Sequence, residues 1–445
     1  MFEETLVLQN PHWAKEPYDS GVKRACFNRL VDYLGTGQIV AITGVRRAGK
    51  STLVRQLIDY LIHFKNVEPS NILFFNLEHP YLSPYRDDDT ILQRIYEDYL
   101  KIMQPKGEIY VFLDEVQFFR GWPIFVKSLH ETKKVRFVVT GSNAAMLSSD
   151  MITMLSGRSL ALEVFPFSLR ELASSKGIDV DNPSEVALKV PEIKHLLDEL
   201  LEYGGFPTVA LKTLNQTAFD ILGAHAKTVL LQDVVPRLGA RKPEDLEKLY
   251  VYLVSNISKL FSYSSLSKLF GLSDKSIKEY LEAFSDAHLV YEVDLFSYSL
   301  KKQMRSQKKV YSIDTGQANA MGFKFNSNRG RLLENLIFID LKRLGLDVYY
   351  FKSEMDYEVD FILKKGEAIS VMQVCWDLND PETRKREVRA LQEAMNELKC
   401  KTGIIIVVEP NLSMEPFEEG INVIPAYQYL MMDRIRQEKF LFKSI

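Results

Sequence analysis

The stretch "GVRRAGKST", residues 44–52, follows the short apolar run "QIVAIT" (38–43) and precedes Leu53, Leu57 and Leu61 at helical spacing. A strand, the sequence G-x-x-x-x-G-K-S and a helix, in this order, are the pattern of a phosphate-binding loop, or P-loop. Its glycines let backbone N–H groups turn toward phosphate oxygens at the positive end of the helix. The stretch therefore predicts a nucleotide site on an α/β sheet.

Two side chains of the loop have expected roles. Lys50 is placed to reach the β- and γ-phosphates of ATP, and Ser51 is placed to ligate Mg²⁺. The alternative, a chance glycine-rich turn, does not account for the full match to the pattern. The predicted nucleotide contacts are Gly44, Val45, Arg46, Arg47, Ala48, Gly49, Lys50, Ser51 and Thr52.

A second apolar run, "IYVFLDEVQFF" (109–119), contains two adjacent carboxylates. We expect Asp114 to hold the water shell of Mg²⁺ and Glu115 to polarise an attacking water as the catalytic base. A base at this position favours ATP hydrolysis over phosphoryl transfer to a small molecule, because kinases exclude water. The alternative for Glu115 is a solvated strand end.

Three further apolar runs lie at residues 71–79, 135–143 and 159–168. They alternate with helical patterns, which predicts a parallel α/β sheet. If the fourth strand lies next to the P-loop strand, Thr140, Ser142 and Asn143 stand beside the loop. We expect Ser142 or Asn143 to hold the attacking water, with Asn143 as the catalytic candidate; the alternative is a turn after the strand.

The composition sets the frame for these motifs. The chain has 445 residues, of which 46% are hydrophobic and 26% charged, and this length suggests about three domains. Its formal net charge of −3 means that affinity for nucleic acid requires a local basic patch. Three cysteines, no signal-peptide pattern and no long apolar run lead us to expect a soluble, cytoplasmic protein without contact to a membrane.

The chain resembles AAA+-type prokaryotic ATPases that carry a C-terminal domain of unknown function with a restriction-nuclease-like, PD-(D/E)xK fold. The resemblance covers nearly the whole chain. It rests on the stretches "ITGVRRAGKSTL", "VFLDEVQ", "VVTGSN", "LSGRSLALEVFPFSLRE", "EYGGFP" and "YEVDFIL…MQVCWDL".

Arginines at three positions gain expected roles. Family members look similar in having basic residues within the loop, where side chains project away from the phosphates. Arg46 and Arg47 are therefore expected to pair with carboxylates such as Glu115 or Glu78, or to face a neighbouring subunit, rather than to replace Lys50. The alternative is two solvated arginines. Arg158 is the candidate arginine that stabilises transition-state charge, in cis or from an adjacent protomer of a homo-oligomer; the alternative is a surface residue.

The expected domains are a P-loop ATPase core (1–166), a helical lid (167–245), a winged-helix-like domain (246–312) and a degenerate nuclease-like domain (313–445). The winged-helix prediction follows from three short helical patterns, the third beginning near Ser273, and two apolar stretches of a hairpin. Candidate contacts to double-stranded DNA lie at the start of the third helix and in the hairpin; the alternative is a protein-contact module. These contacts are Lys275, Lys278, Lys301, Lys302, Arg305, Lys308 and Lys309.

In the last domain, Glu334, Asp360 and Gln373 occupy the positions of a nuclease site. An active site also needs a lysine two residues after Gln373, where this chain has Cys375. Strand alternation puts Lys364 on the face of Asp360, so a migrated lysine is the alternative. We expect no nuclease activity, and a domain that serves as a scaffold or a nucleic-acid contact.

The resulting hypothesis is an ATP-binding, Mg²⁺-dependent, ATP-hydrolysing molecular switch that couples nucleotide state to a nucleic-acid or protein partner. The alternatives are a nucleotide-regulated DNA-binding protein with little turnover and an ATP-dependent nuclease.

Overall fold

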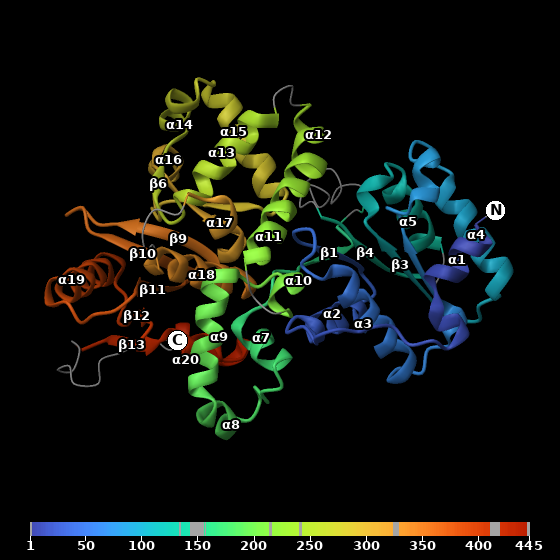
Figure 1. The fold of residues 1–445 in the computed structure, drawn as a ribbon, viewed down its shortest axis with the longest axis horizontal. Helices are drawn as coiled ribbons and strands as arrows, with labels where there is room; N and C mark the ends of the chain where they lie inside the picture. The colour runs from blue at the N-terminus through green and yellow to red at the C-terminus, as the bar shows by residue number, and fades with distance from the viewer. Residues whose placement is uncertain are drawn as a thin grey trace. The chain divides into compact units, whose positions relative to one another are not determined.

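The computed structural model describes residues 2–132, 135–142, 155, 157–212, 216–239, 243–323, 329–409 and 419–442. The chain forms two compact units. The first consists of the residues up to Phe165 together with Asp286–His288, and the second consists of the others from Pro166 onward (Figure 1). Among the described residues, no helix has both the length and the apolar character that crossing a membrane requires.

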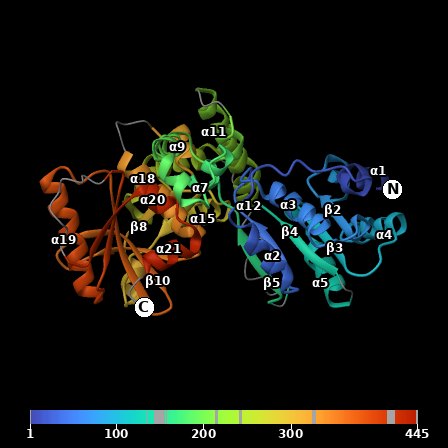
Figure 2. The same ribbon diagram turned by 90° about the horizontal axis from the view of Figure 1, so that it is seen from below.

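The first unit is built on a parallel sheet of five strands in the order β2-β3-β4-β1-β5. The expected neighbourhood of the fourth strand and the P-loop strand is confirmed. The strands are β1 (Ile39–Thr43), β2 (Ile72–Asn76), β3 (Ile109–Asp114), β4 (Val135–Thr140) and β5 (Ser159–Glu163). The helices are α1 (Glu3–Gln9), α2 (Phe27–Gly35), α3 (Lys50–His63), α4 (Ile91–Met103) and α5 (Trp122–Thr132) (Figure 2).

The central strands of this sheet are buried because their apolar runs are covered by helices. The edge strand β2 is protected differently. The side-chain amide of Asn10 donates to Phe74 O (2.9 Å) and its oxygen accepts from Phe74 N (2.7 Å), so one side chain satisfies both backbone groups that a further strand would use.

The second unit begins with the helices that the sequence suggested as a lid. In the structure they belong to this unit, where α9 and α11 pack against α17. The role of residues 167–245 as a helical lid stays a prediction. The helices are α7 (Leu169–Ser175), α8 (Pro183–Leu188), α9 (Val190–Tyr203), α10 (Pro207–Ala210), α11 (Gln216–Val229), the π-helical turn Leu230–Val234, α12 (Val235–Leu238) and α17 (Thr315–Met321).

The "EYGGFP" stretch is a packed junction in this unit. Gly204 has φ +73°, and a Cβ atom there would lie 1.9 Å from the Asp314 carboxylate. The same carboxylate accepts from Gly205 N (2.7 Å) and Gln317 N (2.9 Å). Burial raises the pKa of Asp314 to about 6. The glycines therefore let two segments of the second unit approach closely.

A three-stranded antiparallel sheet, in the order β6-β8-β7, follows together with helices α13, α14, α15 and α16. The expected hairpin pairing is present between β7 and β8, but the connection contains a short helix, α16. The elements in chain order are α13 (Pro243–Ser255), β6 (Leu260–Phe261), α14 (Tyr263–Phe270), α15 (Asp274–Asp286), β7 (Val290–Val293), α16 (Leu300–Arg305) and β8 (Lys308–Ser312).

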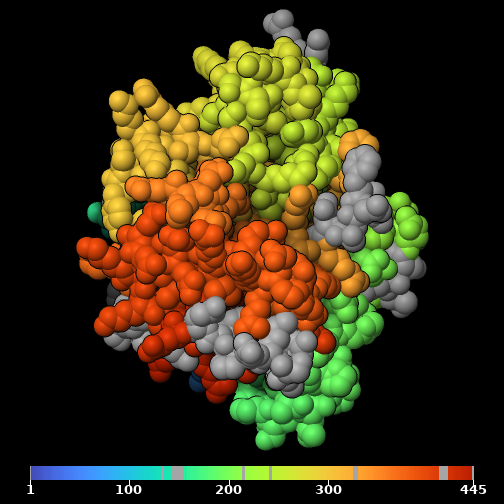
Figure 3. All heavy atoms as spheres, turned by 90° about the vertical axis from the view of Figure 1, so that its left-hand side faces the viewer, coloured from blue at the N-terminus to red at the C-terminus, as the bar shows by residue number. Residues whose placement is uncertain are grey.

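The C-terminal part is a mixed five-stranded sheet in the order β13-β12-β11-β10-β9, in which β9, β10 and β11 are antiparallel and β11, β12 and β13 parallel. Val388 and Leu391 of α19 form its core with Val371 and Ile405. On the face in Figure 3, this orange and red part lies below the yellow helices of the same unit. The elements are α18 (Arg329–Arg343), β9 (Asp347–Lys352), β10 (Glu358–Lys365), β11 (Ala368–Cys375), α19 (Pro381–Leu398), β12 (Gly403–Val407), β13 (Ile421–Pro425), α20 (Ala426–Leu430) and α21 (Arg434–Leu441).

Candidate nucleotide-binding site

The P-loop connects β1 to α3, as the sequence predicts. Gly44 has φ +134°, and a Cβ atom there would lie 2.2 Å from Val164 O of the neighbouring chain segment. Gly49 precedes α3 with φ +99°. Both positions require backbone conformations that a side chain would strain or obstruct. The loop geometry thus depends on the two glycines of the motif.

Lys50 is held at the centre of the loop. Its ammonium donates to Gly44 O (2.9 Å) and Val45 O (3.2 Å), lies 3.9 Å from Glu115 Oε1, and is 3% exposed. The loop thus contains a buried positive charge at the position where the sequence predicts contact with phosphate oxygens.

Asp114 ends β3 next to the first turn of α3. The Ser51 hydroxyl donates to Asp114 Oδ2 (2.8 Å), and the Thr140 hydroxyl donates to Oδ1. Burial, followed by the neighbouring Glu115 charge, raises the pKa of Asp114 above its ordinary value. A hydroxyl and a carboxylate at hydrogen-bond distance are an oxygen donor pair that fits Mg²⁺.

Glu115 follows in a left-handed backbone conformation, φ +57°, and its N–H donates to the Thr140 hydroxyl (3.0 Å). The side-chain amide of Gln117 donates to Glu115 Oε2 (2.5 Å) and to Ser142 Oγ (3.1 Å). The Gln117 amide therefore links the Glu115 carboxylate to the Ser142 hydroxyl. The sequence contained it within "VFLDEVQ", but spacing alone did not reveal its role. Asn143 lies outside the described residues.

The two loop arginines behave differently. Arg46 pairs with Glu78 Oε1 (3.2 Å) and its guanidinium lies 5.9 Å from the Phe118 ring centroid. The expected pairing with an acidic neighbour is confirmed for Arg46. Arg47 is exposed and has φ +66°. Nucleotide contact by either residue stays a prediction.

Arg158 is not near the P-loop within its own chain. It precedes β5, and its carbonyl accepts from Ile39 N at the start of β1 (2.9 Å). Because β1 and β5 are parallel, Arg158 lies at the amino-terminal edge of the sheet, while the P-loop follows the carboxyl end, a strand length of roughly 16 Å away. Its guanidinium pairs with Glu131 Oε1 (2.6 Å). A role in cis is therefore wrong, and a role from an adjacent protomer stays a prediction.

Comparison with known proteins divides the chain into three matched segments. Residues 36–173 match a family model described as an AAA domain. Residues 194–329 and 329–429 match two domains of unknown function, DUF8612 and DUF4143. The chain is 30% identical to "Uncharacterized protein MJ1544" of Methanocaldococcus jannaschii, over 96% of this chain and 95% of that protein. This chain belongs to the same family.

An "Uncharacterized protein" of Haemophilus influenzae is 31% identical to this AAA-domain protein, over 79% of this chain and 85% of that one. Among solved structures, the chain is similar to the Aeropyrum pernix ORC1 protein in complex with DNA, with 14% identity, a TM-score of 0.32, and 70% and 95% of the two chains covered. It is also similar to the S. cerevisiae Hsp104-ADP complex, with 16% identity, a TM-score of 0.31, and 62% and 41% covered.

In the DUF4143 segment, the predicted nuclease positions come together. Glu334 Oε1 and Asp360 Oδ1 lie 3.0 and 2.9 Å from one ammonium, that of Lys309. Gln373 Oε1 accepts from Asp360 N (3.1 Å). The alternative of a migrated Lys364 is wrong, because that side chain is exposed and Lys309 reaches the carboxylates instead. Burial raises the pKa of the Cys375 thiol to about 11, so the thiol is protonated at neutral pH.

The buried position of Lys309 contradicts the prediction that this residue contacts DNA. The Lys309 side chain is 1% exposed and cannot reach a phosphate. Lys308 is also engaged, with Asp294 and with Glu292 (3.7 Å). On α15, the other predicted contacts each face a glutamate one turn later: Lys275–Glu279 at 3.8 Å and Lys278–Glu282 at 3.6 Å.

The basic residues of α16 remain candidates. Lys301, Lys302 and Arg305 are exposed in a six-residue helix that contains no acidic residue. In Figure 3 the amber segment near residue 300 lies at the rim of the visible face of the second unit. Of the predicted DNA contacts, the three on α16 are thus exposed and have no acidic neighbour within their own helix.

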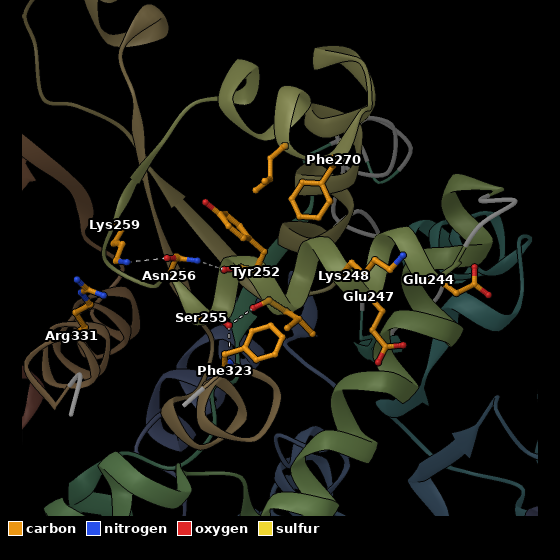
Figure 4. A pocket seen from close by; sticks show the side chains of 12 residues that line it. Glu244, Glu247, Lys248, Tyr252, Ser255, Asn256, Lys259, Phe270, Phe323 and Arg331 are labelled. Atoms are coloured by element: carbon orange, nitrogen blue, oxygen red, sulfur yellow. Dashed lines mark hydrogen bonds between the residues drawn. The ribbon is translucent and has the colours of Figure 1, made fainter. Parts of the chain in front are cut away.

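The second unit also contains a groove of about 990 Å³ along α13. Tyr252 and Phe270 line its middle, Lys259 and Arg331 lie at one end, and Glu244 lies at the other (Figure 4). The groove shares no residue with the P-loop site.

Proposed function

We propose that this chain is a Mg²⁺-dependent, ATP-hydrolysing molecular switch of the AAA+ type. The observation that carries the proposal is the convergence of Lys50, Ser51, Asp114 and Glu115 at the carboxyl edge of the parallel sheet. A phosphate-binding loop and a carboxylate pair at this edge are the parts that hydrolysis of a nucleoside triphosphate requires.

The residues divide the work. Backbone N–H groups of the loop and the Lys50 ammonium bind the phosphates, and Ser51 with Asp114 would hold Mg²⁺, which when bound neutralises phosphate charge. Glu115 accepts a proton from the attacking water. Gln117 keeps the Glu115 carboxylate oriented through its 2.5 Å hydrogen bond. The Ser142 hydroxyl accepts a hydrogen bond from the same Gln117 amide and is the candidate to hold the attacking water.

The decisive experiment measures phosphate release from ATP by the purified protein with and without Mg²⁺. We expect turnover that requires Mg²⁺, and a Lys50→Ala variant whose ATP binding is weakened, because its buried ammonium is removed. Binding of ATP without any phosphate release would favour the alternative, a nucleotide-regulated binding protein with little turnover.

For the partner, we propose that the α13 to β8 segment is a winged-helix domain that contacts duplex DNA through α16. Its order of helix, strand, helix, helix and a strand pair, with the short helix α16 in the connection between the paired strands, supports this interpretation. The exposed lysines and arginine of α16 would contact phosphates and carry little sequence information. For the C-terminal part we propose a degenerate nuclease-like domain with a scaffold role. Cys375 stands at the position where an active nuclease site has its catalytic lysine.

A salt titration on one labelled duplex tests the DNA proposal. Replacing Lys301, Lys302 and Arg305 together by Ala should lower the slope of log affinity against log salt by about 0.9 for each phosphate that these side chains neutralise. The matched control, Lys275→Ala with Lys278→Ala, should change the slope little, because each lysine faces a glutamate. An unchanged slope in the α16 variant would remove DNA from the partners.

A further inference from the structure

The side-chain ammonium of Lys309, in the second unit, contacts three carboxylates. Its Nζ atom lies 2.7 Å from Glu358 Oε1, 2.9 Å from Asp360 Oδ1 and 3.0 Å from Glu334 Oε1. The side chain is 1% exposed. Three carboxylate oxygens thus surround one buried ammonium, a cluster that we call the Lys309 cage.

The cage joins three separate elements. Lys309 comes from β8, Glu334 from α18, and Glu358 and Asp360 from β10. Two residues further along β8, on the same face, the Tyr311 hydroxyl donates to Glu334 Oε1 (2.6 Å). A buried charge is costly unless it is paired and hydrogen-bonded, and here each carboxylate contacts the ammonium.

Two of these oxygens, those of Glu334 and Asp360, belong to the positions that would hold a divalent cation in a nuclease-like site. Hard divalent ions take carboxylate oxygens at roughly 2.0–2.6 Å, around a centre like the one that Nζ occupies. The residues here do not fit such an ion, because the ammonium is already at that centre. Gln373, the third nuclease position, is also engaged, with Asp360 N and Glu387. Within the part of the chain that the structure describes, no group of three His, Cys, Asp or Glu residues is arranged to hold a metal.

We propose that Lys309 is a built-in cation that replaces the divalent ion of this carboxylate cluster, so that the domain excludes metal and β8 is fastened to α18 and β10. The three carboxylates then form a latent metal site, which should bind a divalent ion once the Lys309 ammonium is removed by substitution.

The balance of charge in the Lys309 cage explains why the carboxylates should bind a metal ion when the ammonium is removed. The cage contains three carboxylates and one ammonium. Without the ammonium, the buried carboxylates must bind protons or another cation. A divalent ion, with more charge in less volume, satisfies the same oxygens.

The test compares Mn²⁺ binding by electron paramagnetic resonance in nucleotide-free, full-length wild type and Lys309→Ala. We expect the variant to bind one more Mn²⁺ per chain than wild type, and its melting temperature to rise with Mn²⁺ more than that of wild type. Adding Asp360→Asn to the variant should abolish the extra ion. Lys364→Ala, which removes an exposed lysine from β10, is the matched control and should bind as wild type does.

A folded Lys309→Ala protein that gains no Mn²⁺ overturns the proposal. Lys309→Met, which keeps most of the apolar stem, serves if the alanine variant does not fold. A variant that folds only with Mn²⁺ supports the proposal. If neither variant folds under any condition, Mn²⁺ binding is compared between wild type and Asp360→Asn. Equal Mn²⁺ stoichiometry supports the proposal that the wild-type cage excludes metal. A loss of Mn²⁺ in Asp360→Asn overturns that proposal.

Discussion

Glu115→Gln is expected to slow ATP hydrolysis by about 10²–10⁴-fold while ATP binding is retained. The amide keeps the shape of the side chain but cannot accept a proton from water. The phosphate-binding groups, Lys50 and the loop backbone, are unchanged, so affinity for ATP should stay close to that of wild type. Single-turnover phosphate release, with equilibrium binding of a fluorescent ATP analogue, separates the two effects.

Glu78→Gln is the matched control for this substitution. Glu78 is also a carboxylate near the loop, but it pairs with Arg46, whereas Glu115 is the carboxylate beside Lys50. We expect a change in rate of less than about tenfold, in keeping with the small contribution of exposed ion pairs. A Glu115→Gln protein that hydrolyses ATP at the wild-type rate would show that another group is the base.

Gly205→Ala is expected to destabilise the second unit by roughly 3 kcal/mol or more, because overpacking against backbone atoms leaves no flexible neighbour to move. A Cβ atom at this position would lie 2.3 Å from Phe167 O and 2.8 Å from Phe167 N. Any shift of the backbone would also weaken the bond from Gly205 N to Asp314 (2.7 Å). Urea unfolding followed by circular dichroism measures the change in stability.

Gly223→Ala in α11 provides the comparison. The nearest atom to an added Cβ there is Met321 Sδ at 3.8 Å, an ordinary contact. Alanine in a helix favours folding, so this variant should be as stable as wild type or more stable by up to about 1 kcal/mol. Equal unfolding curves for the two variants would mean that the junction at Gly205 tolerates movement.

Much of the first unit was accessible from sequence, because its signals are local. The P-loop and the strand ending in Asp114 and Glu115 follow from contiguous patterns. The strand order that puts Thr140 beside them was a condition in the sequence analysis, and the pairing of β4 with β1 meets it. Parallel strands bring their carboxyl ends to one edge, so local patterns converge there without further information. The pairing of Arg46 with Glu78 was also among the expectations.

Residues whose role depends on packing between distant segments were predicted less well. Arg158 was a candidate in cis, but the parallel pairing of β5 with β1 puts it at the other edge of the sheet. Residues 167–245 have helical patterns that fit a lid, yet those patterns do not say which surface covers their apolar faces. In the structure α9 and α11 pack against α17, a helix about a hundred residues further along the chain, which no local pattern indicates.

The sequence by itself determined the nucleotide loop, the carboxylates that follow β3 and the parallel sheet that brings them together. Only the tertiary structure decided the role of Lys309. In the sequence it stands among basic residues and resembles a surface charge, whereas its partners Glu334 and Asp360 are 25 and 51 positions away. The environment of a lysine is set by which segments pack around it, and burial among three carboxylates turns a predicted DNA contact into an internal cation.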